Sequence, residues 1–396
     1  MRIAYITHYA DLYGANRSLL DLVLEARSRG AVEPSVLLPK AGPLSERLAL
    51  EGIEHAIVPW ELWMSDRYYV GRAHHRLKQY LGYQRDARER AKRNEQALPA
   101  VLEQLRQWNP QLVHVNSAAV SLVPGLQKHL KTPLIWHIRE LPEDQYLLHL
   151  DAGRKVYGQA LRDADRLIVI SKAVEADVQR YAGKSTAVEV IYNGVLRLAD
   201  YAELASHSEE RWRAPSPFTF LLAGLIHPSK GQEEAIRALA LVKEQCPDVR
   251  LVIAGGGKTE HLKRLIAETG MQTHVDLPGF VPDMRPLLLS SQALLMCSRN
   301  EAMGRVTVEG MGSGLPVIGH NSGGTPELIG GEYGGLLYDH GPEELAQLMI
   351  GLANDPAKAR EMGQHLMRSA AERFNVERYA TEVLGVYRSV LSRFAK

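Results

Sequence analysis

Short apolar runs alternate along the chain with longer segments in which apolar residues recur every three or four positions. The short runs predict buried strands. They lie at residues 2–7, 33–38, 112–115, 134–137, 167–170 and 188–191, and again at 218–223, 250–254, 274–277, 293–296, 316–319 and 335–338. The longer segments, such as 18–28, 232–245, 261–269 and 305–313, predict amphipathic helices. Alternating strands and helices are typical of parallel sheets covered by helices, so the pattern predicts an α/β fold.

Residues 198–217 interrupt this pattern with charged and polar positions that follow no regular period. We interpret this segment as a linker between two α/β domains at residues 1–198 and 215–375. A further amphipathic segment, 377–394, has no strand after it. We expect a helix over 376–396 that packs back on the first domain.

The charged residues are balanced, with 47 lysines and arginines against 46 aspartates and glutamates among 396 residues. This balance excludes a globally basic nucleic-acid binder, so a charged partner must meet a local patch. Two cysteines, Cys246 and Cys297, are too few for a disulfide framework or a cysteine-rich zinc site, and they predict a reducing compartment. The first apolar run is too short for a secretion signal, and no stretch reaches 18 uninterrupted apolar residues. We therefore expect a cytoplasmic protein, either soluble or peripheral at the inner face of a membrane.

Two glutamates, Glu301 and Glu309, follow the strand predicted at 293–296. A helix is expected to begin at Gly304 or Arg305, which puts its free N–H groups at the carboxyl edge of a parallel sheet, where phosphates are favoured. The two glutamates are eight residues apart, which corresponds to a helical rise of about 12 Å. The carboxylates of a retaining glycosidase lie only about 5 Å apart. The spacing therefore disfavours a hydrolase pair and suits two contacts on one elongated ligand.

The segment that contains both glutamates resembles the E-x7-E motif of the retaining glycosyltransferases of family 4. Gly279-Phe280-Val281 before it and Gly323-Gly324-Thr325-Pro326 after it are similar to further segments of that family, with Thr325 expected as a helix N-cap. The resemblance implies the GT-B fold, in which two Rossmann-like domains with parallel sheets face a central cleft that holds the active site.

The resemblance also implies roles for individual residues. Glu309 would bond the ribose of a nucleotide sugar, and Glu301 a hydroxyl of the donor sugar. The sugar and the diphosphate would be faced by the backbone near Met303, Gly304, Arg305 and Val306, with Thr325 in the next loop.

Residues 223–231 are similar to the family segment G-R-L-x-x-x-K-G, whose arginine and lysine neutralise the donor diphosphate. Lys230 matches the lysine, but Leu225 stands where the family has arginine. That departure removes one of two cations from the leaving group, and Arg305 in a neighbouring loop is a candidate substitute.

In the first half, Gly14 keeps the first glycine of a pair that the family places near the donor phosphate and the acceptor, and Ala15 replaces the second. Asn16 and Arg17 follow, and they either reach the acceptor side of the cleft or, for Asn16, cap a helix. By resemblance, His137 takes the place of a catalytic histidine near the donor sugar. His114, at the end of the preceding strand, is the alternative and is assigned to the acceptor side.

Residues 67–93 combine nine lysines and arginines with four interleaved tyrosines and only two acids. This mixture predicts either contact with an anionic membrane surface, which would suit a lipid-linked acceptor, or a solvated helix face. Nucleic acid is not an expected partner.

The sequence as a whole predicts a retaining hexosyltransferase that uses a nucleotide diphosphate sugar, UDP favoured and GDP the second choice, in polysaccharide or glycolipid assembly. The acceptor hydroxyl would belong to a sugar or a lipid-linked sugar, and neither a metal nor a cofactor is predicted. In the family's front-face route the leaving phosphate takes the acceptor's proton. The alternatives are a nucleotide-sugar-binding protein without catalysis and a GT-B nucleotide-sugar epimerase.

Overall fold

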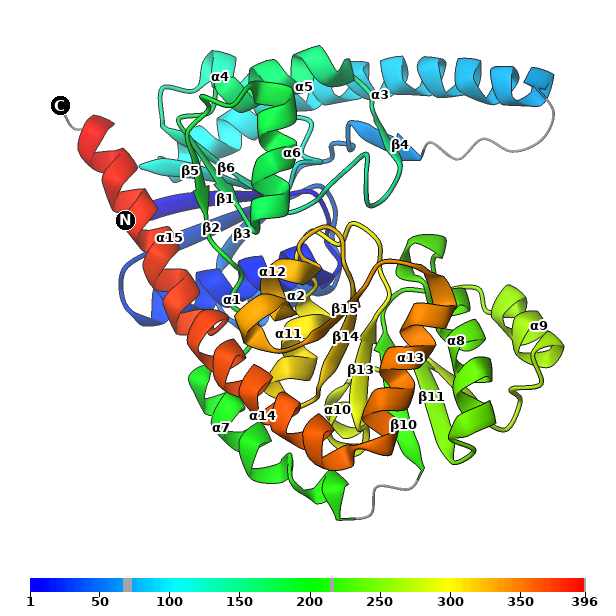
Figure 1. Cartoon of the computed structure of the whole chain (residues 1–396). Helices are drawn as coiled ribbons and strands as arrows, with labels where there is room; N and C mark the ends of the chain where they lie inside the picture. The colour runs from blue at the N-terminus through cyan, green and yellow to red at the C-terminus, as the bar shows by residue number, and fades with distance from the viewer. Residues whose placement is uncertain (67–72, 214–216, 395–396) are drawn as a thin grey trace. The chain divides into compact units, whose positions relative to one another are not determined.

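The computed structural model describes residues 1–66, 73–213 and 217–394. The chain divides into two compact units, one formed by Met1–Gly194 with Val376–Lys396 and the other by Val195–Asn375. Each contains a parallel sheet with helices on both faces, so the predicted α/β class is confirmed (Figure 1).

The sheet of the first unit has seven parallel strands in the order β3-β2-β1-β5-β6-β8-β9. Apolar side chains occupy both faces of its central strands, as expected for a parallel sheet between two helical layers. The strands are β1 (Arg2–Thr7), β2 (Glu33–Leu38), β3 (Glu54–Ile57), β5 (Leu112–Asn116), β6 (Leu134–Ile138), β8 (Arg166–Val169) and β9 (Val188–Val190). A separate antiparallel pair joins β4 (Met64–Asp66) to β7 (Leu148–Leu150).

Helices α1 and α15 cover one face of this sheet, where α15 contributes Tyr379, Val383 and Tyr387 to the core. On the other face, Trp136 of β6 packs edge-on against Tyr157 of α5. The helices of this unit are α1 (Gly14–Ser28), α2 (Pro43–Leu50), α3 (Ala73–Trp108), α4 (Val123–His129), α5 (Gly153–Arg162), α6 (Lys172–Ala182) and α15 (Val376–Phe394).

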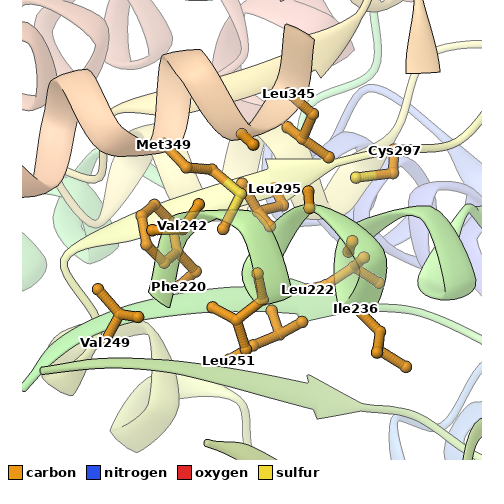
Figure 2. Close-up of a cluster of buried hydrophobic side chains, with 14 of the residues drawn as sticks. Phe220, Leu222, Ile236, Val242, Val249, Leu251, Leu295, Cys297, Leu345 and Met349 are labelled. Atoms are coloured by element: carbon orange, nitrogen blue, oxygen red, sulfur yellow. The ribbon is translucent and has the colours of Figure 1, made fainter. Parts of the chain in front are cut away.

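The second unit has six parallel strands in the order β12-β11-β10-β13-β14-β15. Figure 2 shows the core between this sheet and helices α8 and α13, where Phe220 and Leu295 from the strands meet Val242 and Met349 from the helices. The strands are β10 (Phe218–Ala223), β11 (Val249–Ala254), β12 (Val275–Gly279), β13 (Ala293–Met296), β14 (Val317–His320) and β15 (Leu336–Tyr338). The helices are α7 (Leu198–His207), α8 (Gln232–Gln245), α9 (Glu260–Glu268), α10 (Arg285–Ser290), α11 (Arg305–Gly312), α12 (Thr325–Ile329), α13 (Gly341–Asn354) and α14 (Pro356–Arg373).

The segment predicted as a linker is helical over most of its length and belongs to the second unit. Helix α7 buries Tyr201 and Leu204, and the next turn buries Arg211, whose guanidinium donates to the carbonyls of Ser291 and Ser313. The boundary between the units therefore falls at Val195 rather than near residue 215. The two ends of the second unit lie together, because the Val195 N–H donates to the Phe374 carbonyl at 2.9 Å.

Candidate active site

Two loops at the carboxyl edge of the second sheet bring an ammonium and a carboxylate into contact. Strands β10 and β13 are neighbours, so the loops that follow them meet although they are far apart in sequence. Lys230 Nζ lies 2.6 Å from Glu301 Oε2, and their side chains are 16% and 12% exposed. The structure thus joins two residues that the sequence predicted separately.

A short 3-10 turn, Pro228–Lys230, positions the lysine. It starts at His227, whose Nδ1 accepts from the Ser229 N–H, and it ends at Gly231 with a φ of +70°. A Cβ at Gly231 would also lie 2.5 Å from the Cys297 carbonyl oxygen, so only glycine fits there. The Arg299 N–H donates to the Ser229 carbonyl, which fastens this turn to the loop after β13.

The loop that carries Glu301 is held against the loop after β14 by backbone contacts. The Gly324 N–H donates to the Glu301 carbonyl at 2.6 Å, and the Asn300 N–H donates to Ser322 Oγ at 2.9 Å. A Cβ at Gly323 would lie 2.4 Å from the Glu301 carbonyl oxygen. The absence of side chains at Gly323 and Gly324 therefore lets the two loops approach closely, and the backbone of Glu301 is held in place by this contact.

Helix α11 starts directly after this loop, with Gly304 as its N-cap at a φ of +83°. The Thr307 N–H donates to the Gly304 carbonyl at 3.1 Å, and the positive end of the helix dipole at this terminus favours an anion. Met303 is buried before the helix, and Glu309 is buried in its second turn, at 8% exposure. The sequence prediction of where this helix begins is confirmed.

Thr325 does not have the predicted N-cap role. Gly324 is the N-cap of α12, and Thr325 is the first helical residue. Its side chain is completely buried, and its hydroxyl has no hydrogen-bond partner.

The position at which the family has arginine is occupied by a solvent-exposed leucine. The Leu225 side chain is 55% exposed, while its carbonyl accepts from Gln232 Nε2 at 2.9 Å. The Arg305 guanidinium, the candidate substitute, donates to the Val195 carbonyl at 3.3 Å.

At the carboxyl edge of the first sheet, Asn16 is an internal support rather than a surface group or a helix cap. It is buried within α1, whose N-cap is Tyr13. Its Nδ2 donates to the carbonyls of Tyr9 and Asp11, and Thr7 Oγ donates to its Oδ1. Asn16 thus fixes the loop after β1, while Gly14 and Arg17 beside it are exposed.

His137 and His114 are both completely buried inside the first unit. His137 faces Tyr379 of α15, and His114 Nδ1 lies 2.7 Å from the Tyr387 hydroxyl. Burial lowers the pKa of both histidines well below the ordinary value, and the Arg139 guanidinium lowers it further. Both rings lie in the core of this unit, and a substrate contact by either of them stays a prediction.

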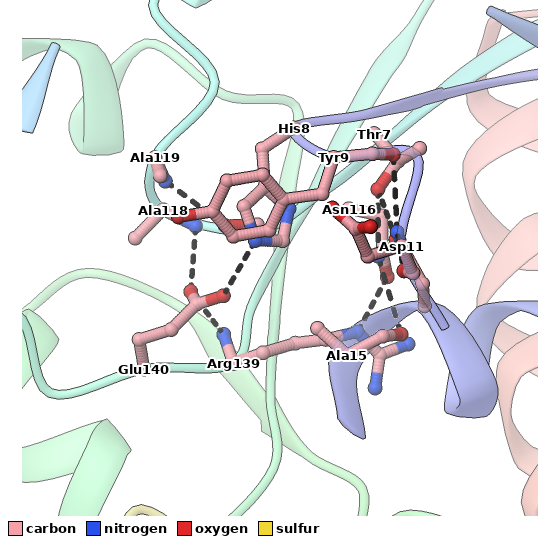
Figure 3. A network of polar contacts seen from close by, with 12 residues as sticks. Thr7, His8, Tyr9, Asp11, Ala15, Asn116, Ala118, Ala119, Arg139 and Glu140 are labelled. Carbon is pink, nitrogen blue, oxygen red and sulfur yellow. Dashed lines mark hydrogen bonds and ion pairs between the residues drawn. The ribbon is translucent and has the colours of Figure 1, made fainter. Parts of the chain in front are cut away.

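The sequence analysis overlooked three neighbouring residues at the same edge, His8, Arg139 and Glu140 (Figure 3). Arg139 is 4% exposed and donates to the side chains of Asn116, Asn193 and Tyr379. These bonds connect the loop after β6 with the end of β5, the turn after β9 and helix α15. Glu140 accepts from the Ala118 N–H at 2.9 Å, and its other oxygen lies 3.9 Å from His8 Nε2. All three lie within three residues of the end of a predicted strand, and this position is the signal that could have identified them.

The buried neutral histidines predict a loss of stability in acid. The unfolded chain takes up a proton at each histidine near pH 6.5, whereas the folded chain does not, so stability is full above that pH and decreases as the pH falls. Each of these histidines is expected to lower the free energy of unfolding by about 1.4 kcal/mol for every pH unit below 6.5. Urea unfolding at pH 7.5 and 5.5, followed by tryptophan fluorescence, measures this decrease, because four of the five tryptophans lie in the first unit.

Replacing His137 by glutamine removes one of these protonations and is expected to reduce the pH-dependent decrease by about 1 kcal/mol. The matched control is His129→Gln, at an exposed position of α4. An unchanged pH dependence in H137Q would contradict the assignment of a neutral, buried imidazole.

Among residues 1–66, 73–213 and 217–394, no group of three histidine, cysteine or acidic side chains is arranged to hold a metal ion. None of the helices described is both long and apolar enough to cross a membrane.

Two family profiles match the chain, and together they cover most of it. The profile for glycosyltransferase family 4 matches residues 13–195, and the profile for glycosyl transferases group 1 matches residues 207–366.

Among the relatives, the D-inositol 3-phosphate glycosyltransferase of Streptomyces avermitilis is 30% identical over 254 residues, which are 59% of this chain and 53% of that protein. The protein of the same name from Jonesia denitrificans is 31% identical over 223 residues, which are 52% of each chain. The matches therefore span about half the length of these relatives.

Solved structures give the same fold at lower identity. Anabaena HepE in complex with UDP and glucose has a TM-score of 0.76 and 22% identity, over 98% of this chain and 100% of that chain. Sucrose-phosphate synthase from Thermosynechococcus elongatus has a TM-score of 0.74 and 20% identity, over 99% and 100%. The chain belongs to the glycosyltransferases of group 1 and family 4, and its two parallel-sheet units are the two halves of the GT-B fold.

Proposed function

We propose that this protein transfers a sugar from a nucleotide diphosphate sugar to an acceptor hydroxyl with retention of the anomeric configuration. The observation that carries the proposal is the Lys230–Glu301 contact at the carboxyl edge of the second sheet, beside the start of α11. A cation, a carboxylate and the positive end of a helix dipole there suit a diphosphate attached to a sugar. Family membership supports the same reaction class.

In this proposal Lys230 and the first amides of α11 stabilise the diphosphate as its bond to the sugar breaks. Glu301 accepts a hydrogen bond from a sugar hydroxyl, so donor binding replaces part of its contact with Lys230. Glu309 bonds the ribose. The acceptor oxygen attacks the anomeric carbon on the face that the phosphate leaves, and a phosphate oxygen takes the acceptor's proton.

Because Lys230 and the helix amides supply the positive charge, we propose that the reaction needs no metal ion. We propose UDP as the nucleotide, since the Anabaena neighbours were solved with UDP, with UDP and glucose, and with UDP-glucose. The acceptor is proposed to be a hydroxyl of a sugar or of a lipid-linked sugar.

Two measurements test the proposed function. A thermal-shift series with UDP-, GDP- and ADP-sugars identifies the donor, and UDP-sugars are expected to give the largest increase in melting temperature. NMR of the product from an α-linked donor is then expected to show an α linkage, at a rate that EDTA does not change. A β-linked product would contradict retention, and conversion of the donor sugar without an acceptor would indicate an epimerase.

A second candidate is a protein that binds a nucleotide sugar without transferring it, and the exposed Leu225 favours this candidate. If the diphosphate lies beside this residue, Leu225→Arg returns the second cation and is expected to raise the transfer rate about 10-fold or more. Transfer kinetics with the preferred donor measure the change. The control is Leu198→Arg, a similarly exposed leucine at the start of α7. Tighter donor binding with no transfer in L225R would support the binding protein.

A further inference from the structure

Helix α3 is anchored to the first unit by aromatic contacts that include Tyr80, whose ring lies edge-on to His149 of β7 with centroids 6.5 Å apart. The Tyr83 ring stacks on His149 of β7, with ring centroids 4.3 Å apart. Arg90 Nε donates to Asp151 Oδ2 at 2.9 Å, and Val101 and Leu105 are buried farther along the helix. Since the helix spans Ala73–Trp108, its first turns lie before these anchors.

The first turns of α3 extend away from the sheet of the first unit (Figure 1). Every residue from 74 to 81 is exposed. The exposed side chains include Leu77 at 59%, Leu81 at 60% and Tyr80 at 42%. We call residues 74–85 the α3 arm. Two solvent-exposed leucines on a projecting helix indicate a surface that binds another molecule.

The exposed leucines form a face distinct from the face that packs. At about 100° per residue, Leu77, Leu81 and Arg88 fall within an arc of about 40°, with Lys78 and Arg85 about 60° to one side. The buried positions Ala87 and Asn94 lie about 100° to the other side. The arm therefore presents a continuous apolar and basic face to solvent, and binding through this face would leave the buried contacts of the helix intact.

The charge of this face has one sign. Residues 74–85 contain Arg76, Lys78 and Arg85 and no acid. Arg85 pairs only with the adjacent Asp86, at an exposed position, and Lys78 and Arg88 form no ion pair with the other residues that the structure describes. Because the whole chain carries a formal charge of only +1, this concentration of positive charge is local.

We propose that the α3 arm docks on an anionic lipid surface. Leu77 and Leu81 enter the boundary between headgroups and acyl chains, while Lys78, Arg85 and Arg88 lie beside the anionic headgroups with their aliphatic stems along the apolar layer. Charge complementarity selects an anionic occupant, and the like charges on the arm oppose pairing with a second copy. The exposed leucines select lipid over single-stranded RNA, which is bound chiefly by stacking on aromatic rings.

Flotation with vesicles tests the proposal on the full chain without any donor. The protein is expected to float with phosphatidylcholine vesicles that contain 30% phosphatidylglycerol, not with phosphatidylcholine alone, and to be released at high salt. Lys78→Glu/Arg88→Glu is expected to lower the partition coefficient at least 10-fold, because each basic residue near the surface contributes about fivefold. Leu81→Glu is expected to reduce binding by a similar factor.

Matched substitutions at other exposed positions provide the controls. Lys263→Glu/Arg264→Glu on α9 changes the net charge equally, and Leu50→Glu removes an exposed leucine from α2. Both should bind vesicles like the unchanged protein. Equal loss in these controls, binding to neutral vesicles, or binding to poly(U) RNA without binding to vesicles would overturn the proposal. The donor-induced thermal shift should persist in all variants, so failure here is distinct from failure of the proposed transfer reaction.

Discussion

Replacing Lys230 by alanine is expected to lower the rate of sugar transfer by about 100-fold to 1000-fold. The Lys230 ammonium lies against Glu301, and the second cation of the family segment is absent because that position is Leu225. Without Lys230, the charge that develops on the departing diphosphate is left to the helix amides and the candidate cation Arg305. Steady-state kinetics with a saturating donor measure the loss in kcat.

Three further variants separate catalysis from folding. Lys263→Ala removes an exposed lysine from α9 and should leave the rate unchanged. Glu301→Gln should also lower transfer, and the double variant should lose less than the product of the two single losses, because the two side chains act through one contact. A Lys230→Ala protein that melts normally and retains transfer within threefold would remove Lys230 from the mechanism.

Replacing Arg139 by alanine is expected to lower the free energy of unfolding of the first unit by about 4 kcal/mol. The guanidinium donates to the side chains of Asn116, Asn193 and Tyr379, all within the buried interior. Its removal leaves these oxygens without their partner and opens space beside His137. A loss of this size is a large part of the 5–15 kcal/mol that typically stabilises a domain.

Urea unfolding followed by tryptophan fluorescence measures this effect, and hydrogen exchange should show faster exchange of the α15 amides. Arg139→Lys is not expected to rescue stability, because an ammonium lacks the planar fork that reaches three directions. Arg162→Ala, at an exposed position of α5, is the control. A loss below 1 kcal/mol in R139A would show that the network contributes packing alone.

The sequence pattern predicted strands well wherever an apolar run forms a strand that helices cover on both faces of the sheet. All twelve predicted strands are present, within one or two residues at their ends. The three strands that it missed are short. β4 and β7 have three residues each, and the edge strand β3 has four, none of them fully buried, and no continuous apolar run. Helix α7 was missed because Tyr201 and Leu204 are its only buried residues.

The candidate site was predictable in part, for a physical reason. Lys230 and Glu301 each follow a predicted strand, but their contact depends on β10 lying next to β13, and strand order is set by packing across the whole sheet. The burial of His137 was not predictable because its strand is buried on both faces, so the pattern cannot tell a ring that points into the core from one at the sheet edge. Thr325 was misplaced by a single residue at a helix start.

The division of the chain into units has a consequence for the order of folding. The second unit is an insertion between β9 and α15 of the first, with its ends joined by the Val195–Phe374 hydrogen bond. During synthesis it is therefore the first part with all of its own residues available, because the earlier unit still lacks Tyr387 and Tyr379, the partner of Arg139 on α15. Until α15 arrives, the apolar face of α1 and the buried polar cluster beneath it are open to water, which makes the nascent first unit the species that chaperones would meet.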